Sequence, residues 1–89
     1  MTRKEEIIQV LINLGGEGSL KEIVEGVKSI TKLGVPRTLD AGIRCVLERH
    51  SSDSYSYLGK EDLFYSVEGI GGGIWGLRRI NESRNHKRY

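Results

Sequence analysis

The chain has 89 residues and a formal net charge of +2, and 37% of its residues are hydrophobic. This length allows one domain with a modest core, which excludes a catalytic domain joined to a second module, and the hydrophobic content excludes a disordered chain. The single cysteine, Cys45, excludes an internal disulfide. Because we also find no signal peptide and no apolar run of membrane-spanning length, we expect a soluble, cytoplasmic protein without a membrane partner.

Charge is unevenly distributed along the chain. Residues 78–89 carry five basic side chains against one acidic one, a balance of +4, whereas residues 1–77 carry nine basic against eleven acidic ones, a balance of −2. A domain of this kind that binds nucleic acid has to rely on local patches and on its basic end. We therefore expect its affinity to fall with salt in proportion to a small number of neutralised phosphates.

Two capping-box spacings mark the starts of the first two helices. Thr2 is followed by Glu5 at the required interval, and apolar residues then recur at helical spacing until a glycine pair at 15–16. Ser19 and Glu22 repeat the spacing ahead of a second apolar stripe that ends at residue 30. The segment 31–36 contains a glycine and a proline, so it predicts the turn between helices two and three.

The third helix is predicted from about residue 38 to about residue 50. Thr38 is in position to cap it, and Asp40 falls in the first turn near the positive end of the helix dipole. One side of this helix is apolar. The opposite side carries polar or small residues able to enter a groove: Arg37, Asp40, Ala41, Arg44 and Glu48.

The last third of the chain predicts a β-hairpin. Residues 62–67 alternate as a strand does, the glycine-rich run 69–73 predicts a turn, and residues 74–78 predict the return strand. Trp75 and Leu77 share one side of that strand, and we expect them to pack on the helices. The predicted fold is α+β, a winged helix-turn-helix with three helices followed by a C-terminal β-hairpin wing. The domain covers residues 1–79, and 80–89 form a basic, flexible tail.

The strands DLFYSV and IWGLR, with the glycine-rich turn between them, resemble those of the HARE-HTH group of winged-helix modules, which are found fused to restriction endonucleases. The resemblance covers roughly residues 5–78. It implies a reader of double-stranded DNA, and by broader analogy with the winged helix of adenine-methylation-dependent restriction endonucleases it implies a preference for methylated adenine. The same group includes the amino-terminal domain of the bacterial RNA polymerase delta subunit, so the resemblance also allows a protein-contact role.

We expect helix three to dock in the major groove, with Arg37 and Arg44 as the two side chains able to make bidentate contacts there. The loop after it has two interpretations, a polar contact surface or a simple helix exit, and its tyrosines either stack on DNA or complete the core edge. Basic residues flanking the wing are candidates for phosphate contacts. The predicted DNA-binding set is Arg37, Thr38, Asp40, Ala41, Arg44, Ser51, Ser52, Asp53, Ser54, Tyr55, Tyr57, Lys60, Arg78 and Arg79.

We predict neither catalysis nor a cofactor. His50 and His86 are far apart in the sequence, Cys45 falls on an apolar helix face, and no paired-cysteine or His-Glu-x-x-His spacing is present, which argues against a metal site or a nucleophilic triad. The glycine-rich run lacks the Lys-Ser/Thr pair of a phosphate-binding loop. Binding is the favoured class, with double-stranded DNA as the expected partner. The alternative is a protein-interaction module that docks on a nuclease, on RNA polymerase or on a second copy of the chain.

Overall fold

The capping boxes start the first two helices at the predicted positions. In the computed structural model, which describes residues 1–69 and 72–78, α1 is Arg3–Asn13 and α2 is Leu20–Ile30. The Thr2 hydroxyl accepts a hydrogen bond from the Glu5 N–H, and the Glu5 carboxylate accepts one from the Thr2 N–H. Ser19 and Glu22 make the same reciprocal pair. N–H groups that the helices themselves leave free are thus satisfied locally at both starts.

The third helix, α3, is Leu39–Arg49, which lies within one residue of the predicted range at each end. Thr38 occupies the N-cap position, but its side chain makes no capping hydrogen bond. The backbone there has φ −93° and ψ 18°, which is not the extended conformation that capping residues adopt. The helix is instead fixed by its buried side, where Leu39, Ile43 and Leu47 are at most 3% exposed.

The predicted hairpin is part of a three-stranded antiparallel sheet. β2 is Phe64–Ser66 and β3 is Ile74–Leu77, both shorter than the predicted runs. A further strand that the sequence did not indicate, β1 (Glu17–Ser19), follows the glycine pair after α1. The strand order is β1-β3-β2, so β3 is central and pairs with both neighbours.

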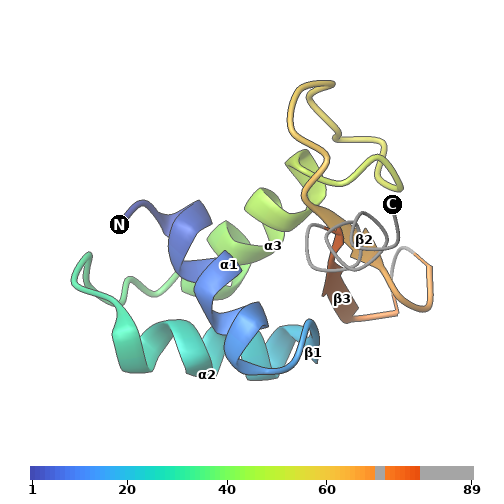
Figure 1. The fold of residues 1–89 in the computed structure, drawn as a ribbon. Coiled ribbons are helices and arrows are strands. Elements are labelled where there is room, and N and C mark those ends of the chain that lie inside the picture. Colours follow the sequence, from blue (N-terminus) through green and yellow to red (C-terminus); the bar gives the residue numbers. More distant parts are fainter. Residues whose placement is uncertain (70–71, 79–89) are drawn as a thin grey trace.

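The sheet packs one face on the helices. Trp75 and Leu77 of β3 are 4% and 1% exposed, which confirms that they are core residues, and Phe64 of β2 is completely buried beside them. They join the apolar sides of α1, α2 and α3 in a single core. Figure 1 shows the three helices grouped together and the sheet at one end of the group, opposite the N-terminus.

The outer face of the sheet is organised around Gly76. Glu17, Gly76 and Tyr65 lie opposite one another on the three strands. The Tyr65 ring lies over Gly76 and its hydroxyl donates a hydrogen bond of 2.6 Å to the Glu17 carboxylate. A side chain at position 76 would occupy the space of the ring. Glycine in the central strand therefore lets one tyrosine join all three strands.

The architecture is α+β, with three helices and a small antiparallel sheet, and it is compatible with a winged helix. Among the described residues, no helix is both long and apolar enough to cross a membrane. The predicted basic tail, residues 80–89, lies outside the described residues, and so does Arg79.

Replacing Gly76 by alanine is expected to destabilise the domain by about 0.5–1.5 kcal/mol, because the added methyl group displaces the Tyr65 ring and breaks its hydrogen bond to Glu17. Urea denaturation measures this change. Gly42→Ala is the control, since a methyl group on the exposed side of α3 meets nothing. That variant is expected to be more stable by about 0.5–1 kcal/mol, since alanine is the better helix former. Equal midpoints for the wild type and Gly76→Ala would contradict the described packing.

Candidate nucleic-acid interface

The solvent side of α3, together with the two residues before it, carries the first group of predicted contact residues. Arg37, Thr38, Asp40, Ala41 and Arg44 are all exposed. They are exposed because the opposite side of the helix is the one buried against α1, α2 and the sheet. The structure therefore brings these five residues together on one accessible surface, which we call the α3 face.

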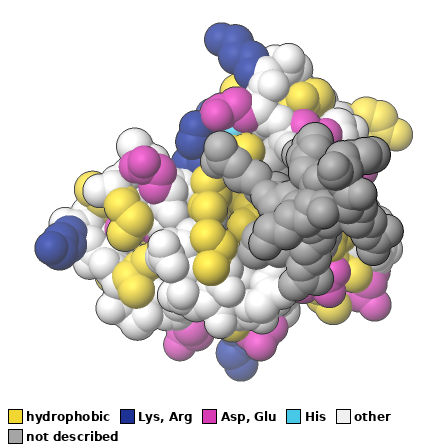
Figure 2. All heavy atoms as spheres, viewed as in Figure 1, with side chains coloured by type: hydrophobic (Ala, Val, Ile, Leu, Met, Phe, Trp, Pro, Cys, Tyr) yellow, Lys and Arg dark blue, Asp and Glu magenta, His cyan; other side chains and the backbone are white. Residues whose placement is uncertain are grey.

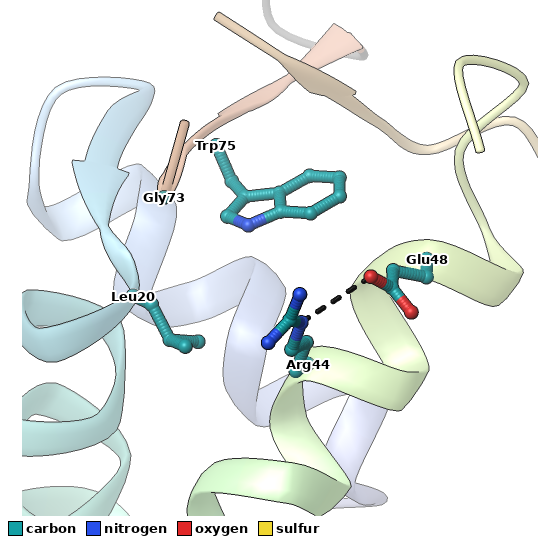
Figure 3. Close-up of a pocket in the computed structure, with 5 residues that line it drawn as sticks. All are labelled: Leu20, Arg44, Glu48, Gly73 and Trp75. Atoms are coloured by element: carbon teal, nitrogen blue, oxygen red, sulfur yellow. Dashed lines mark hydrogen bonds and ion pairs between the residues drawn. The ribbon is translucent and has the colours of Figure 1, made fainter. Parts of the chain in front are cut away.

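A small hollow lies beside Arg44. It has a volume of about 90 Å³ and is lined by Leu20, Arg44, Glu48, Gly73 and Trp75. Arg44 Nε donates a hydrogen bond of 3.3 Å to Glu48 Oε2. Figure 3 shows the guanidinium below the Trp75 indole, with Leu20 on one side and the dashed contact to Glu48 on the other. Among the described residues, Glu48 is thus the hydrogen-bond partner of the Arg44 guanidinium, and it contacts only the Nε edge.

The charge around the α3 face is mixed. A second hollow, between α2 and α3, is bordered by Lys21 and Lys28 but also by Glu25 and Asp40. Lys28 pairs with Glu25 at 3.2 Å. Residues 1–69 and 72–78 together carry ten basic and eleven acidic side chains. Figure 2 likewise shows basic and acidic side chains interspersed on the face that it presents. No strong positive field is therefore available from this part of the chain.

The loop after α3 fits one of its two interpretations, the helix exit, better than the other. Ser51 is fully buried, and its hydroxyl accepts a hydrogen bond from the Asp53 N–H. Its side chain therefore offers no surface to a ligand. Ser52 is exposed but bonds Asp62 twice, through its N–H at 2.8 Å and its hydroxyl at 2.7 Å. Asp53 accepts a hydrogen bond from the Ser66 N–H. These bonds favour the interpretation as a helix exit.

Arg78 is also occupied within the protein, although it is predicted as a phosphate contact. Its Nε donates to Asp62 at 3.0 Å and to the Phe64 carbonyl at 2.9 Å, and its Nη2 donates to Asp53 at 3.1 Å and to the Ser52 hydroxyl at 3.3 Å. We call Ser52, Asp53, Asp62 and Arg78 the loop clamp. It ties the segment after α3 to the end of the sheet, and the sequence did not single out Asp62 for it.

Four remaining predicted contacts belong to the same loop. Tyr55 is fully exposed, Tyr57 and Ser54 are half-buried, and Lys60 is exposed. This loop follows the C-terminal end of α3, whereas Arg37 precedes its N-terminal end. An 11-residue helix is roughly 16 Å long, so the structure separates these residues from the start of the α3 face.

The loop clamp also closes the outer edge of β2. The Phe64 N–H donates to the His50 carbonyl, the Phe64 carbonyl accepts from Arg78, and the Ser66 N–H donates to Asp53. An incoming strand needs these backbone groups free in order to pair. A protein partner that extends the sheet at β2 would have to displace the clamp first.

Acid should loosen the clamp through Asp62. Partial burial raises the pKa of this carboxyl, but hydrogen bonds from Ser52 and the interaction with Arg78 together lower it more, so the pKa lies below its ordinary value of 3.8.

Among the described residues, no group of three His, Cys, Asp or Glu side chains is placed to hold a metal ion.

Comparison with protein-family models, with curated proteins and with solved structures found no match. The similarity to the HARE-HTH group therefore remains a prediction from the sequence.

Replacing Asp62 by alanine is expected to lower the free energy of unfolding by about 1–2 kcal/mol at neutral pH. This loss is toward the low end for hydrogen bonds to charged groups, because the Asp62 side chain is 35% exposed and solvent screens its interactions. The native pKa is depressed, so this contribution is complete above pH 3.8 and is lost as the pH falls through the lower native value. Urea denaturation across this range measures it. Glu68→Ala, an exposed acidic residue on the same hairpin, is the control. A wild-type advantage that persists undiminished well below pH 3.8 would contradict this role.

Proposed function

We propose that this protein is a winged-helix domain that binds double-stranded DNA with the α3 face in the major groove. The observation that carries the proposal is the shared exposure of Asp40, Ala41 and Arg44 on α3 and of Arg37 and Thr38 just before it, while the other side of α3 is buried in the core. A helix of this size fits the major groove of B-DNA, and an arginine on its exposed side can make a bidentate contact to guanine.

The proposed interface is smaller than the sequence alone suggested. Ser51 is buried, and Ser52, Asp53 and Arg78 have partners within the loop clamp, so we leave these four residues out of it. Lys60 stays as an exposed candidate for a phosphate contact. Because the described residues supply no net positive charge, we expect only a few phosphate contacts, each of which contributes roughly −0.9 to the slope of log K against log salt.

A preference for methylated adenine is a refinement that rests on the sequence resemblance. Reading the added methyl group requires an apolar surface in the major groove. Of the apolar candidates, Ala41 lies on the α3 face, whereas Tyr55 and Tyr57 belong to the loop at the far end of the helix. Ala41 is therefore the residue that we propose for contact with the methyl group.

Protein binding is the second candidate, favoured by the near-neutral described surface and by exposed apolar residues in the turn between α2 and α3. Leu33 and Val35 are 54% and 55% exposed there. Since the outer edge of β2 is closed, we propose that a protein partner would contact the helices rather than extend the sheet at that edge.

Arg44→Ala is expected to weaken binding to a preferred duplex by about 1–3 kcal/mol if Arg44 contacts a base. Fluorescence anisotropy titration with a labelled duplex measures the loss. The matched control is Arg49→Ala, which removes an exposed arginine five residues further along α3 and on a different side of the helix. Equal losses for the two variants would contradict base contact by Arg44 and indicate general charge attraction.

A matched pair of duplexes tests the methyl preference. Adenine-methylated DNA is expected to bind about five-fold or more tightly than the same unmethylated duplex, and Ala41→Gly is expected to reduce this ratio, since it removes the apolar contact. Equal affinities would reject the methyl preference while leaving duplex binding intact. Absence of salt-dependent binding to either duplex, with a protein partner co-purifying, would favour the second candidate.

A further inference from the structure

Glu48 is an unexpected residue for its position on α3. It lies in the last turn, where the negative end of the helix dipole disfavours a carboxylate. Its pair with Arg44 also has the arginine on the N-terminal side, the less favourable order for an i,i+4 pair. On a helix that faces DNA, a carboxylate moreover repels phosphates. Helix stability and general affinity both argue against Glu48, so its presence requires another reason.

The geometry supplies that reason. The Glu48 side chain is only 24% exposed and lines the hollow with Trp75, whereas Arg44 is 57% exposed. The less exposed carboxylate accepts a hydrogen bond of 3.3 Å from Nε of the more exposed arginine. Figure 3 shows both side chains at the hollow, with the Arg44 guanidinium below the Trp75 indole and the dashed contact to Glu48 on one side of it.

We propose that Glu48 is a positioning residue that holds Arg44 for end-on, bidentate recognition of guanine. This inference rests on the proposed DNA binding. An arginine contacts guanine O6 and N7 through two N–H groups, either with both terminal nitrogens or with Nε and one terminal nitrogen. Since Glu48 occupies Nε, only the terminal pair is available. Glu48 thereby selects one of the two binding modes, while its negative charge lowers the affinity of the protein for DNA of any sequence.

The test compares variants that differ in one property at a time. Glu48→Ala and Glu48→Gln both remove the negative charge, but the glutamine oxygen can still accept the Arg44 Nε hydrogen bond. Both variants suit a helix, so we expect both to fold. The full chain is first used to select a preferred duplex from a random library. Each guanine of that duplex is then replaced in turn by 7-deazaguanine, which lacks N7.

At one guanine, the wild type is expected to lose about ten-fold in affinity on this replacement. Glu48→Ala should bind duplexes in general more tightly, yet lose most of that ten-fold discrimination. Glu48→Gln should show the same general gain and keep most of the discrimination. In an Arg44→Ala background, Glu48→Ala should change the discrimination no further, because there is no arginine left to position.

Each other outcome overturns a defined statement. If no duplex is enriched by the wild type, the proposed DNA binding fails and the positioning role fails with it. If the wild type binds but no guanine depends on N7, or if Glu48→Ala keeps full discrimination, the positioning role alone is overturned. Equal loss of discrimination in Glu48→Ala and Glu48→Gln would assign the effect to charge and would likewise overturn it.

Discussion

The fold depends on the burial of Trp75 and Leu77, two residues of the central strand β3. Both are almost completely buried with Phe64 against the helices. Their alternation places Gly76 on the outer face, where the Tyr65 ring crosses it to reach Glu17 of β1. Arg78 then follows at the strand end and holds the loop after α3. The four consecutive residues 75–78 thus connect the core, both sheet partners and the loop.

This arrangement explains which surfaces remain for a partner. The helices use their apolar sides in the core, and the loop clamp occupies the outer edge of β2. Among the regions predicted as contacts, the α3 face stays open and keeps its arginines exposed. The strands β2 and β3, which resemble a wing in the sequence, pack on the helices in the described structure, and the end of β3 is bonded to the loop after α3.

Local signals predicted the helices well. The two capping boxes and the apolar stripes act within a few residues, so the starts of α1 and α2 can be read directly from the sequence. The strand β1 could not, because three residues have no clear period and form a strand only through pairing with β3, more than fifty residues away. The role of Asp62 was missed because its partners, Ser52 and Arg78, lie 10 and 16 residues away along the chain. The complete burial of Ser51 likewise depends on how the loop folds, and a serine in a polar run gives no sign of it.

The structure also separates candidates that the sequence placed in one set. Arg44 is exposed on the α3 face. Arg78, which the sequence also predicted as a DNA contact, has four hydrogen-bond partners within the protein. Sequence reasoning could not distinguish the two, because the difference lies in acidic residues that the fold brings to Arg78. Glu48, by contrast, lies close to Arg44 in the sequence, but its place in the hollow with Trp75 became visible only in the structure.

The central claim is that the α3 face contacts duplex DNA while the loop clamp does not. Amide chemical-shift mapping of the ¹⁵N-labelled full chain during titration with a duplex tests it most directly. The account predicts the largest shifts between residues 37 and 48, with the amides of Ser52, Asp62 and Arg78 nearly unchanged. Largest shifts at the clamp residues, or no shifts at any duplex concentration, would contradict it.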